Sequence, residues 1–205
     1  VVQRCHESIV GGSESLAWHY ATLLSEVYQV DILTTTAIDI LHWSNTLPEG
    51  VEMREGVAIN RFPVTIGRLP YWSNFLRKLF RDFDREVKRE DGTGKSSRRL
   101  PWSIGLQEEF IRTQGPYSEP LVQYLRERWS EYKSIIFTTY LYPTTYFGIF
   151  QVPKGIALLA PTLHDEPTAY LSAFKHAAHR ARSMVWLTKA ERRVGVKLWG
   201  ELPGQ

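Results

Sequence analysis

The chain opens with the stretch Val1-Val2-Gln3-Arg4-Cys5-His6-Glu7-Ser8-Ile9-Val10-Gly11-Gly12-Ser13-Glu14. A short apolar strand leads into a loop, the loop closes on the pair Gly11-Gly12, and a helix follows at once. The helix is predicted by positions that recur every three or four residues and mark one buried face: Leu16, His19, Tyr20, Leu23, Leu24 and Val27. A strand, a glycine pair and a helix in this order are typical of a ligand-binding loop in an α/β protein.

The glycine pair has two interpretations. Because Gly11 and Gly12 carry no side chain, the backbone can approach a ligand closely. The free N–H groups and the positive end of the helix dipole then favour an anion such as a phosphate, so the pattern predicts nucleotide or phospho-sugar binding. The alternative is a simple turn in which Ser13 supplies the capping hydroxyl. The dinucleotide fingerprint G-x-G-x-x-G is absent, because no third glycine follows at the required place.

Apolar strand patterns alternate with helical patterns along the rest of the chain. Strands are expected at 1–4, 30–35, 57–63, 134–139, 156–160 and 184–187, and helices at about 14–27, 73–90, 118–132, 143–151 and 166–181. The runs 135–137 and 156–159 are continuously apolar, which suits central parallel strands covered on both faces. The pattern therefore predicts an α/β fold: a doubly wound, mainly parallel, Rossmann-like sheet with ligands at the carboxyl ends of its strands.

Composition limits the class of protein. The 205 residues are 43% hydrophobic and 13% aromatic, which fits one globular domain with a substantial core. The single cysteine excludes an internal disulfide, and no apolar run reaches the ~18 residues that span a bilayer. The net charge is +3, and the basic residues are interspersed with acids, so nucleic-acid binding is not expected. We expect a cytoplasmic protein, with contact to the inner face of a membrane as an option.

No metal site is expected. Of the six histidines only His176 and His179 share helical i, i+3 spacing, and no carboxylate completes a ligand pattern near them. Both are interpreted as exposed helix residues. A Gly-x-Ser-x-Gly nucleophile elbow does not occur either.

The stretch 162–167, Thr-Leu-His-Asp-Glu-Pro, directly follows an expected strand and so falls where an α/β domain builds its site. His164 beside two carboxylates could bind a sugar hydroxyl, hold a phosphate or transfer protons. The alternative is that Asp165 or Glu166 only caps the helix that begins near Pro167.

Aromatic and hydroxyl side chains gather after another expected strand, at 138–145. Tyrosines such as Tyr140 and Tyr142 offer a sugar an apolar face for stacking and a polar edge for hydrogen bonds. The alternative is that they cover the edge of the sheet.

Residues 72–90 form an amphipathic pattern with an aromatic stripe and basic residues elsewhere: Trp72, Phe75, Leu76, Leu79, Phe80, Phe83 and Val87 make the stripe. Such a helix could lie on an anionic membrane surface, or the stripe could pack on its own domain. The loop 89–105 breaks the alternation of strands and helices, and its polar, glycine-containing part 90–97 is expected to be mobile. Its Gly94-Lys95-Ser96 is not a P-loop, because Arg89 stands where that motif needs a glycine.

These motifs resemble, in their order, the amino-terminal half of GT-B glycosyltransferases, most closely the retaining family-four enzymes of bacterial polysaccharide assembly. The resemblance covers nearly the whole chain and rests on Val2-Gln3-Arg4, Gly11-Gly12-Ser13-Glu14, 30–35, 56–57, 61–64, Gln114-Gly115-Pro116, 140–142, 161–166 and Thr188-Lys189-Ala190-Glu191. It implies two Rossmann-like domains that face each other across a cleft, with residues 1–205 as the acceptor-side domain. The donor-binding second domain would then lie beyond Gln205, and this fragment alone is expected to be inactive.

The resemblance also implies roles for single residues. Gly11 and Gly12 would approach the diphosphate of an NDP-sugar donor, with Glu14 at the acidic position after them, and His164 would lie beside the transferred sugar as the catalytic residue. The acceptor, a glycan or a lipid-linked glycan, is assigned to Arg4, Tyr140, Tyr142, Thr162, Asp165 and Glu166. Retention by front-face attack needs no protein nucleophile, and neither a cofactor nor a metal is expected. The alternatives are a non-catalytic α/β binding or interaction module and a GT-B epimerase or phosphorylase.

Overall fold

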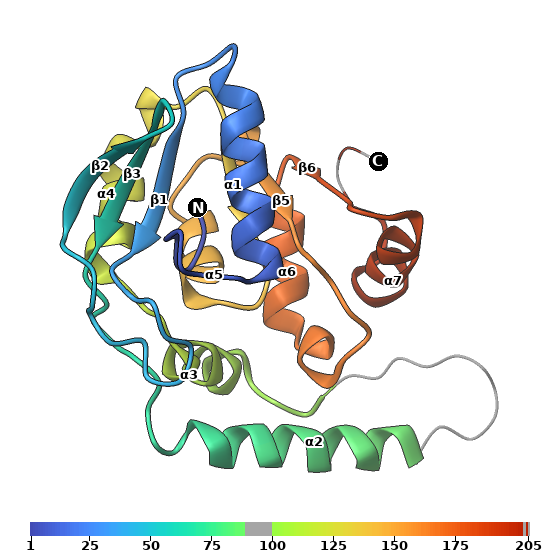
Figure 1. The fold of residues 1–205 in the computed structure, drawn as a ribbon. Coiled ribbons are helices and arrows are strands. Elements are labelled where there is room, and N and C mark those ends of the chain that lie inside the picture. Colours follow the sequence, from blue (N-terminus) through green and yellow to red (C-terminus); the bar gives the residue numbers. More distant parts are fainter. Residues whose placement is uncertain (89–99, 203, 205) are drawn as a thin grey trace.

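The computed structural model describes residues 1–88, 100–202 and 204 (Figure 1). Within them the strands are β1 (Asp31–Thr35), β2 (Gly50–Arg54), β3 (Val57–Phe62), β4 (Ile135–Thr138), β5 (Ala157–Ala160) and β6 (Ser183–Met184). The α-helices are α1 (Gly12–Ser25), α2 (Trp72–Lys88), α3 (Ile104–Gln114), α4 (Glu119–Arg128), α5 (Pro143–Ile149), α6 (Ser172–Arg180) and α7 (Lys189–Trp199). Three short 3-10 helices complete this part of the chain: η1 (Trp129–Glu131), η2 (Lys154–Ile156) and η3 (Pro167–Tyr170). The protein is therefore of the α/β class.

The strands form two small, mostly parallel sheets, ordered β1-β3-β2 and β4-β5-β6. All pairs are parallel except β2 with β3, which are antiparallel. The N-terminal segment, residues 1–4, lies between the two sheets. The Val2 amide donates to the Leu33 carbonyl at 3.1 Å, and the Thr138 amide donates to the Val1 carbonyl at 2.9 Å. The segment thus hydrogen bonds to β1 on one side and to β4 on the other.

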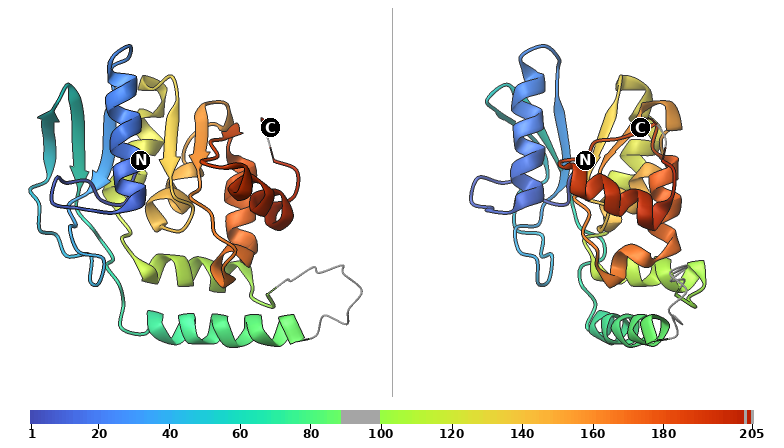
Figure 2. Two further views of the ribbon diagram at one scale, coloured as in Figure 1. Left: turned by 45° about the vertical axis from the view of Figure 1, so that its right-hand side comes forward. Right: turned by 90° about the vertical axis from the view of Figure 1, so that its right-hand side faces the viewer.

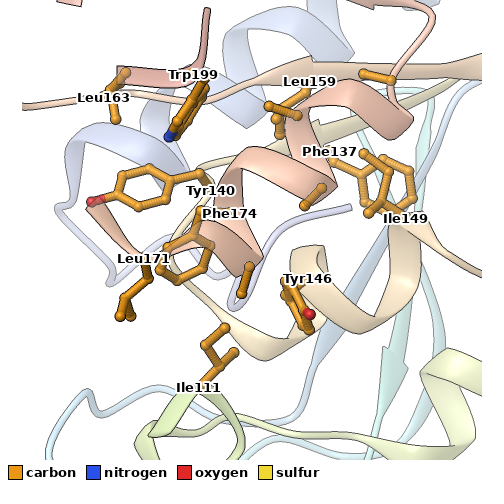
Figure 3. Close-up of a cluster of buried hydrophobic side chains, with 14 of the residues drawn as sticks. Ile111, Phe137, Tyr140, Tyr146, Ile149, Leu159, Leu163, Leu171, Phe174 and Trp199 are labelled. Atoms are coloured by element: carbon orange, nitrogen blue, oxygen red, sulfur yellow. The ribbon is translucent and has the colours of Figure 1, made fainter. Parts of the chain in front are cut away.

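Helices lie on both sides of this strand array. In the two views of Figure 2, α1 lies on one side of β1, and α4 lies on the other. A large buried cluster fills the space between β4, β5 and their helices, with Phe137, Tyr140, Phe174 and Trp199 among its members (Figure 3). The ring of Tyr140 contacts the rings of Phe174 and Trp199 edge-on, with centroid distances of 4.8 Å and 5.6 Å. This packing fixes the chain that leaves β4 against α6 and α7.

Helix α2 packs on its own domain through most of its aromatic stripe. Leu79 is fully buried, Trp72 stacks on Phe110 of α3 at 5.9 Å, and Phe83 meets Tyr170 of η3 at 4.9 Å. Phe80 is the exception, with 47% of its surface exposed. No helix in the described part of the chain is long and apolar enough to cross a membrane. The predicted contact of 72–90 with a membrane surface stays a prediction.

The predicted alternation of strands and helices is confirmed for all the expected helices, but α3, α7 and β2 were missed. Residues 1–4, expected to be a strand, form only an isolated bridge from Arg4 to Thr35. The stretch 89–105 was expected to be one loop. Residues 89–99 lie outside the described residues, whereas Leu100 and Trp102 are buried and α3 begins at Ile104, so the expectation is wrong at its carboxyl end. The pattern of α3 is hidden because Gln107, Thr113 and Gln114 occupy buried positions in place of apolar residues. The prediction that His179 is exposed is also wrong: it is half-buried, with Nε2 2.9 Å from the Trp199 carbonyl.

Candidate functional site

Helix α1 begins at the carboxyl edge of the sheet with an uncapped N-terminus. Gly11 is the N-cap residue, in ordinary extended backbone, and no side chain in the described ranges caps the helix. The first intrahelical bond runs from the Ser15 amide to the Gly11 carbonyl at 2.9 Å, so the amides of Gly12, Ser13 and Glu14 precede it. The alternative that Ser13 is the cap is wrong: its hydroxyl donates to Glu14 Oε2 at 2.8 Å.

A buried carboxylate lies against this N-terminus. Glu14 is only 7% exposed, and its Oε1 accepts from Arg4 Nε at 2.5 Å and from Gln3 Nε2 at 3.0 Å. A Cβ atom on Gly11 would come within 2.3 Å of Glu14 Oε2, whereas a Cβ on Gly12 would meet nothing within 4 Å. A side chain at Gly11 would therefore displace the Glu14 carboxylate, whereas Gly12 leaves open space beside the first amides of the helix. Arg4 neutralises the carboxylate and also donates from Nη1 to the Ile38 carbonyl at 2.6 Å.

The chain leaving β4 supplies two tyrosines with different environments. Thr139, directly after the strand, has φ +61°, a strained left-handed conformation for a β-branched residue. Tyr140 is 3% exposed, and its hydroxyl donates to Glu166 Oε1 at 2.5 Å and lies 3.1 Å from Thr168 Oγ1. Burial, with Glu166 close by, raises the pKa of Tyr140 well above its usual value. In this position Tyr140 holds Glu166 and has little surface to offer a ligand.

Tyr142 lies between β4 and α5, two residues after Tyr140. It is half-buried, its ring meets Trp43 edge-on at 5.3 Å, and its hydroxyl has no hydrogen-bond partner within the described residues. Burial raises the pKa of Tyr142, and four charged groups from other segments act on the same hydroxyl: Glu14, Arg4, Arg68 and Glu166. Charged groups of the N-terminal segment, the start of α1, the β3–α2 connection and the β5–η3 connection therefore all influence the Tyr142 hydroxyl.

The chain leaving β5 carries the remaining predicted residues. Thr162 has φ +51°, a second strained position at a strand end. His164 is exposed and makes no side-chain hydrogen bond in the described part of the chain, while its carbonyl accepts from the Glu166 amide at 3.0 Å. Asp165 accepts from the Tyr170 hydroxyl at 2.6 Å and from Lys197 Nζ at 3.0 Å. Glu166 is the N-cap residue of η3, but its side chain makes no capping bond, so this alternative is wrong for Glu166.

Two site residues were missed by sequence reasoning. Glu191 is buried, and its carboxylate accepts from the amides of Leu163 at 2.8 Å and Leu187 at 2.6 Å, so it holds the segment that carries His164. The signal was present: Thr188 and Glu191 have capping-box spacing, and the Thr188 hydroxyl does accept from the Glu191 amide at 3.0 Å. Arg68, the second, lies in a connection without periodic pattern and offered no such signal.

Hollows elsewhere on the surface were not anticipated. A cavity of about 470 Å³ lies between α1 and the strands β1 and β4, lined by residues that include Ala17, Leu24, Ile32 and Ile136. It contains none of the predicted site residues. In the ranges 1–88 and 100–202, no three His, Cys, Asp or Glu side chains gather as metal ligands would.

Comparison with known proteins finds no match for the chain. No protein-family model matches the chain, and neither the curated proteins nor the solved structures contain a match. The function therefore has to be inferred from the residues and their geometry.

Proposed function

We propose that this chain is the acceptor-side domain of a retaining glycosyltransferase, one half of a GT-B architecture, which moves a sugar from an NDP-sugar to a glycan or lipid-linked acceptor. The observation that carries the proposal is the setting of Tyr142. The charges of Arg4, Glu14 and Glu166 act on its hydroxyl, and these three residues, which come from three other segments, were all predicted as site residues. The resemblance in motif order and the geometry thus both indicate a binding site at the carboxyl edge of the sheet.

The order of the strands supports the finer fold that the proposal requires. With the N-terminal segment between the sheets, the strands run β2-β3-β1-(1–4)-β4-β5-β6. From residues 1–4 the chain passes through α1 to β1 on one side, and from β4 it passes through α5 to β5 on the other. In a doubly wound, Rossmann-like sheet the strand order reverses at such a point, and ligands bind there, outside the carboxyl ends of the strands. Arg4 ends the N-terminal segment and Tyr142 follows β4, the two neighbouring elements at which the order reverses.

The start of α1 supplies the groups that a donor diphosphate needs. Amides of Gly12, Ser13 and Glu14 point along the helix axis, and the helix dipole adds partial positive charge. Because Arg4 offsets the charge of Glu14, the carboxylate does not by itself repel an anion from this end. In the transfer reaction these donors would stabilise the charge that develops on the leaving phosphate.

The loop after β5 supplies the group beside the transferred sugar. The His164 side chain is exposed and free of side-chain hydrogen bonds in the described residues, so it is available to a substrate hydroxyl. Glu191 and Tyr140 hold the chain on either side of it through Leu163 and Glu166. Retention by front-face attack requires no protein nucleophile, and the proposal includes no metal.

The remaining parts of the proposal concern partners and location. A donor-binding domain carried by the same polypeptide would close over the crevice. The protein would act in the cytoplasm at the inner face of a membrane, touching it through the exposed side of α2, where Arg77, Phe80 and Arg81 lie.

The experiment that tests the proposal measures nucleotide release by the complete gene product from a panel of NDP-sugars, with and without lipid-linked acceptors. Release that one donor supports, and that an acceptor stimulates, is the expected result. A folded product that binds a sugar but releases no nucleotide from any donor would favour the non-catalytic binding module.

A further inference from the structure

Arg68 and Tyr142 both contact the ring of Trp43, and the Arg68 side chain is held in a fixed position there. It lies in the connection between β3 and α2, and its guanidinium stacks over the ring of Trp72 at 4.5 Å and reaches Trp43 at 5.9 Å. Its Nε donates to the Gln114 carbonyl at 3.3 Å, and its backbone amide donates to the His42 carbonyl at 3.2 Å. Two tryptophans and two backbone carbonyls thus orient a half-buried cation.

This cation has no counter-ion among the described residues. No carboxylate in the described part of the chain lies within 4 Å of Arg68, and its two terminal amino groups make no hydrogen bond there. Among the described residues, the carboxylate of Asp39 acts on Arg68 from a distance. Its own oxygens are already occupied, because they accept four backbone amides, from residues 41–44, at 2.6–3.2 Å. Glu14 is likewise paired with Arg4.

We propose that Arg68 and the Tyr142 hydroxyl form a subsite for an oxyanion, a phosphate or carboxylate group of the acceptor. A guanidinium is planar, stays charged under all ordinary conditions and presents two parallel N–H donors that match both anions. Stacking on Trp72 fixes the plane of this fork before a ligand arrives, which lowers the entropic cost of binding. Tyr142, whose hydroxyl has no partner among the described residues, adds a third donor.

The subsite specifies the proposed function further, because it predicts an acceptor that carries a phosphate or carboxylate group. The claim that the bound group belongs to the acceptor rests on the proposed function, whereas the claim that Arg68 binds an oxyanion does not. Burial, the dominant cause, lowers the pKa of Arg68, as expected for a cation that is partly removed from water without a partner. A bound anion would offset the free-energy cost of keeping the half-buried guanidinium charged.

Tryptophan fluorescence provides the test, because Trp43 and Trp72 flank the guanidinium. The chain is titrated with inorganic pyrophosphate and with glucuronate, at constant ionic strength held with chloride. A saturable fluorescence change with at least one of these anions is expected. Arg68→Gln should weaken binding about tenfold or more, since it removes charge-assisted hydrogen bonds, and Arg68→Lys should weaken it less because the charge is kept.

Two variants complete the design. Tyr142→Phe keeps the ring against Trp43 and removes only the hydroxyl, so it should weaken binding a few-fold even if Arg68→Gln does not fold. Arg77→Gln, on the exposed side of α2, is the matched control and should bind as the parent does. No saturable change, or equal affinity in Arg68→Gln and Arg77→Gln, would overturn the subsite. Arg68-dependent binding in a protein that transfers no sugar would leave the subsite standing and remove the acceptor assignment.

Discussion

Arg4 Nε lies 2.5 Å from Glu14 Oε1, so the residue that ends the N-terminal segment is bonded directly to the first turn of α1. The ion pair thus links two segments that are separated along the chain by the loop of residues 5–11. Gln3 and Ser13 donate to the same carboxylate. The position of the helix N-terminus at the carboxyl edge therefore depends on one buried charged group and its partners.

Arg4→Met should destabilise the chain by about 3 kcal/mol, because it leaves the buried Glu14 carboxylate without its cation. Urea unfolding at neutral pH measures the change. The double variant Arg4→Met with Glu14→Gln should recover much of the loss, since no charge is then left unpaired. Equal stability of the parent and the single variant would show that the pair does not hold the start of α1.

Glu191→Ala should cost about 2–4 kcal/mol, since the amides of Leu163 and Leu187 both lose a buried acceptor. Glu191→Gln keeps one acceptor oxygen and should lose less. The exposed Glu201→Gln serves as the control in the same denaturant series. If Glu191→Ala unfolds at the same urea concentration as Glu201→Gln, the carboxylate does not hold the His164 segment.

The Asp39 carboxylate should make stability depend on acidity. Burial acts to raise its pKa, but amide hydrogen bonds from residues 41–44 outweigh that effect and lower the pKa from 3.8 to about 2. A carboxyl whose folded pKa is depressed contributes stability above its unfolded pKa of about 3.9, and the contribution is lost as the pH falls toward 2. Between pH 5 and pH 3 the parent should therefore lose more stability than Asp39→Asn, measured by urea unfolding at both pH values. Parallel losses would contradict this role.

Gly11 and Gly12 should respond differently to a side chain. Gly11→Ala brings a Cβ against the Glu14 carboxylate and should lower the melting temperature by a few degrees, at roughly 1 kcal/mol. Gly12→Val meets open space and should fold normally, yet it places a branched side chain beside the free amides of α1. In the complete gene product Gly12→Val should therefore raise the donor concentration needed for half-maximal rate. Unchanged donor affinity and rate would remove the start of α1 from the donor site.

The alternation of strands and helices could be predicted because it rests on local apolar runs. Ile135–Thr138 and Ala157–Ala160 are buried along nearly their whole length, and such runs are visible without any tertiary information. Helix α3 could not be predicted in this way. Gln107 lies in its buried face and is satisfied there by Trp102, just before the helix, and by Ser172 and Ala173 of the distant α6. The apolar stripe is broken by a residue whose partners the sequence does not identify.

The residues of the candidate site could be predicted where they directly follow a strand. Tyr142 and His164 were predicted because they follow apolar runs, and both lie after strands as expected. Two facts could not be predicted. Tyr140 and Tyr142 are alike in sequence, but packing against Phe174 and Trp199 buries only the first. Arg68 is held in place by contacts of its guanidinium with Trp43 and Trp72, which lie 25 and 4 residues away along the chain. No local sequence pattern indicates these contacts.

The most direct test follows a labelled sugar from an NDP-sugar donor to an isolated acceptor, using the complete gene product and its His164→Ala variant. We expect a labelled glycan whose anomeric configuration, read by proton NMR, is the same as in the donor. His164→Ala should fold normally and transfer far more slowly, because its exposed side chain supports no other part of the described structure. Transfer with inverted configuration, or no transfer by folded protein from any donor in the panel, would contradict the account.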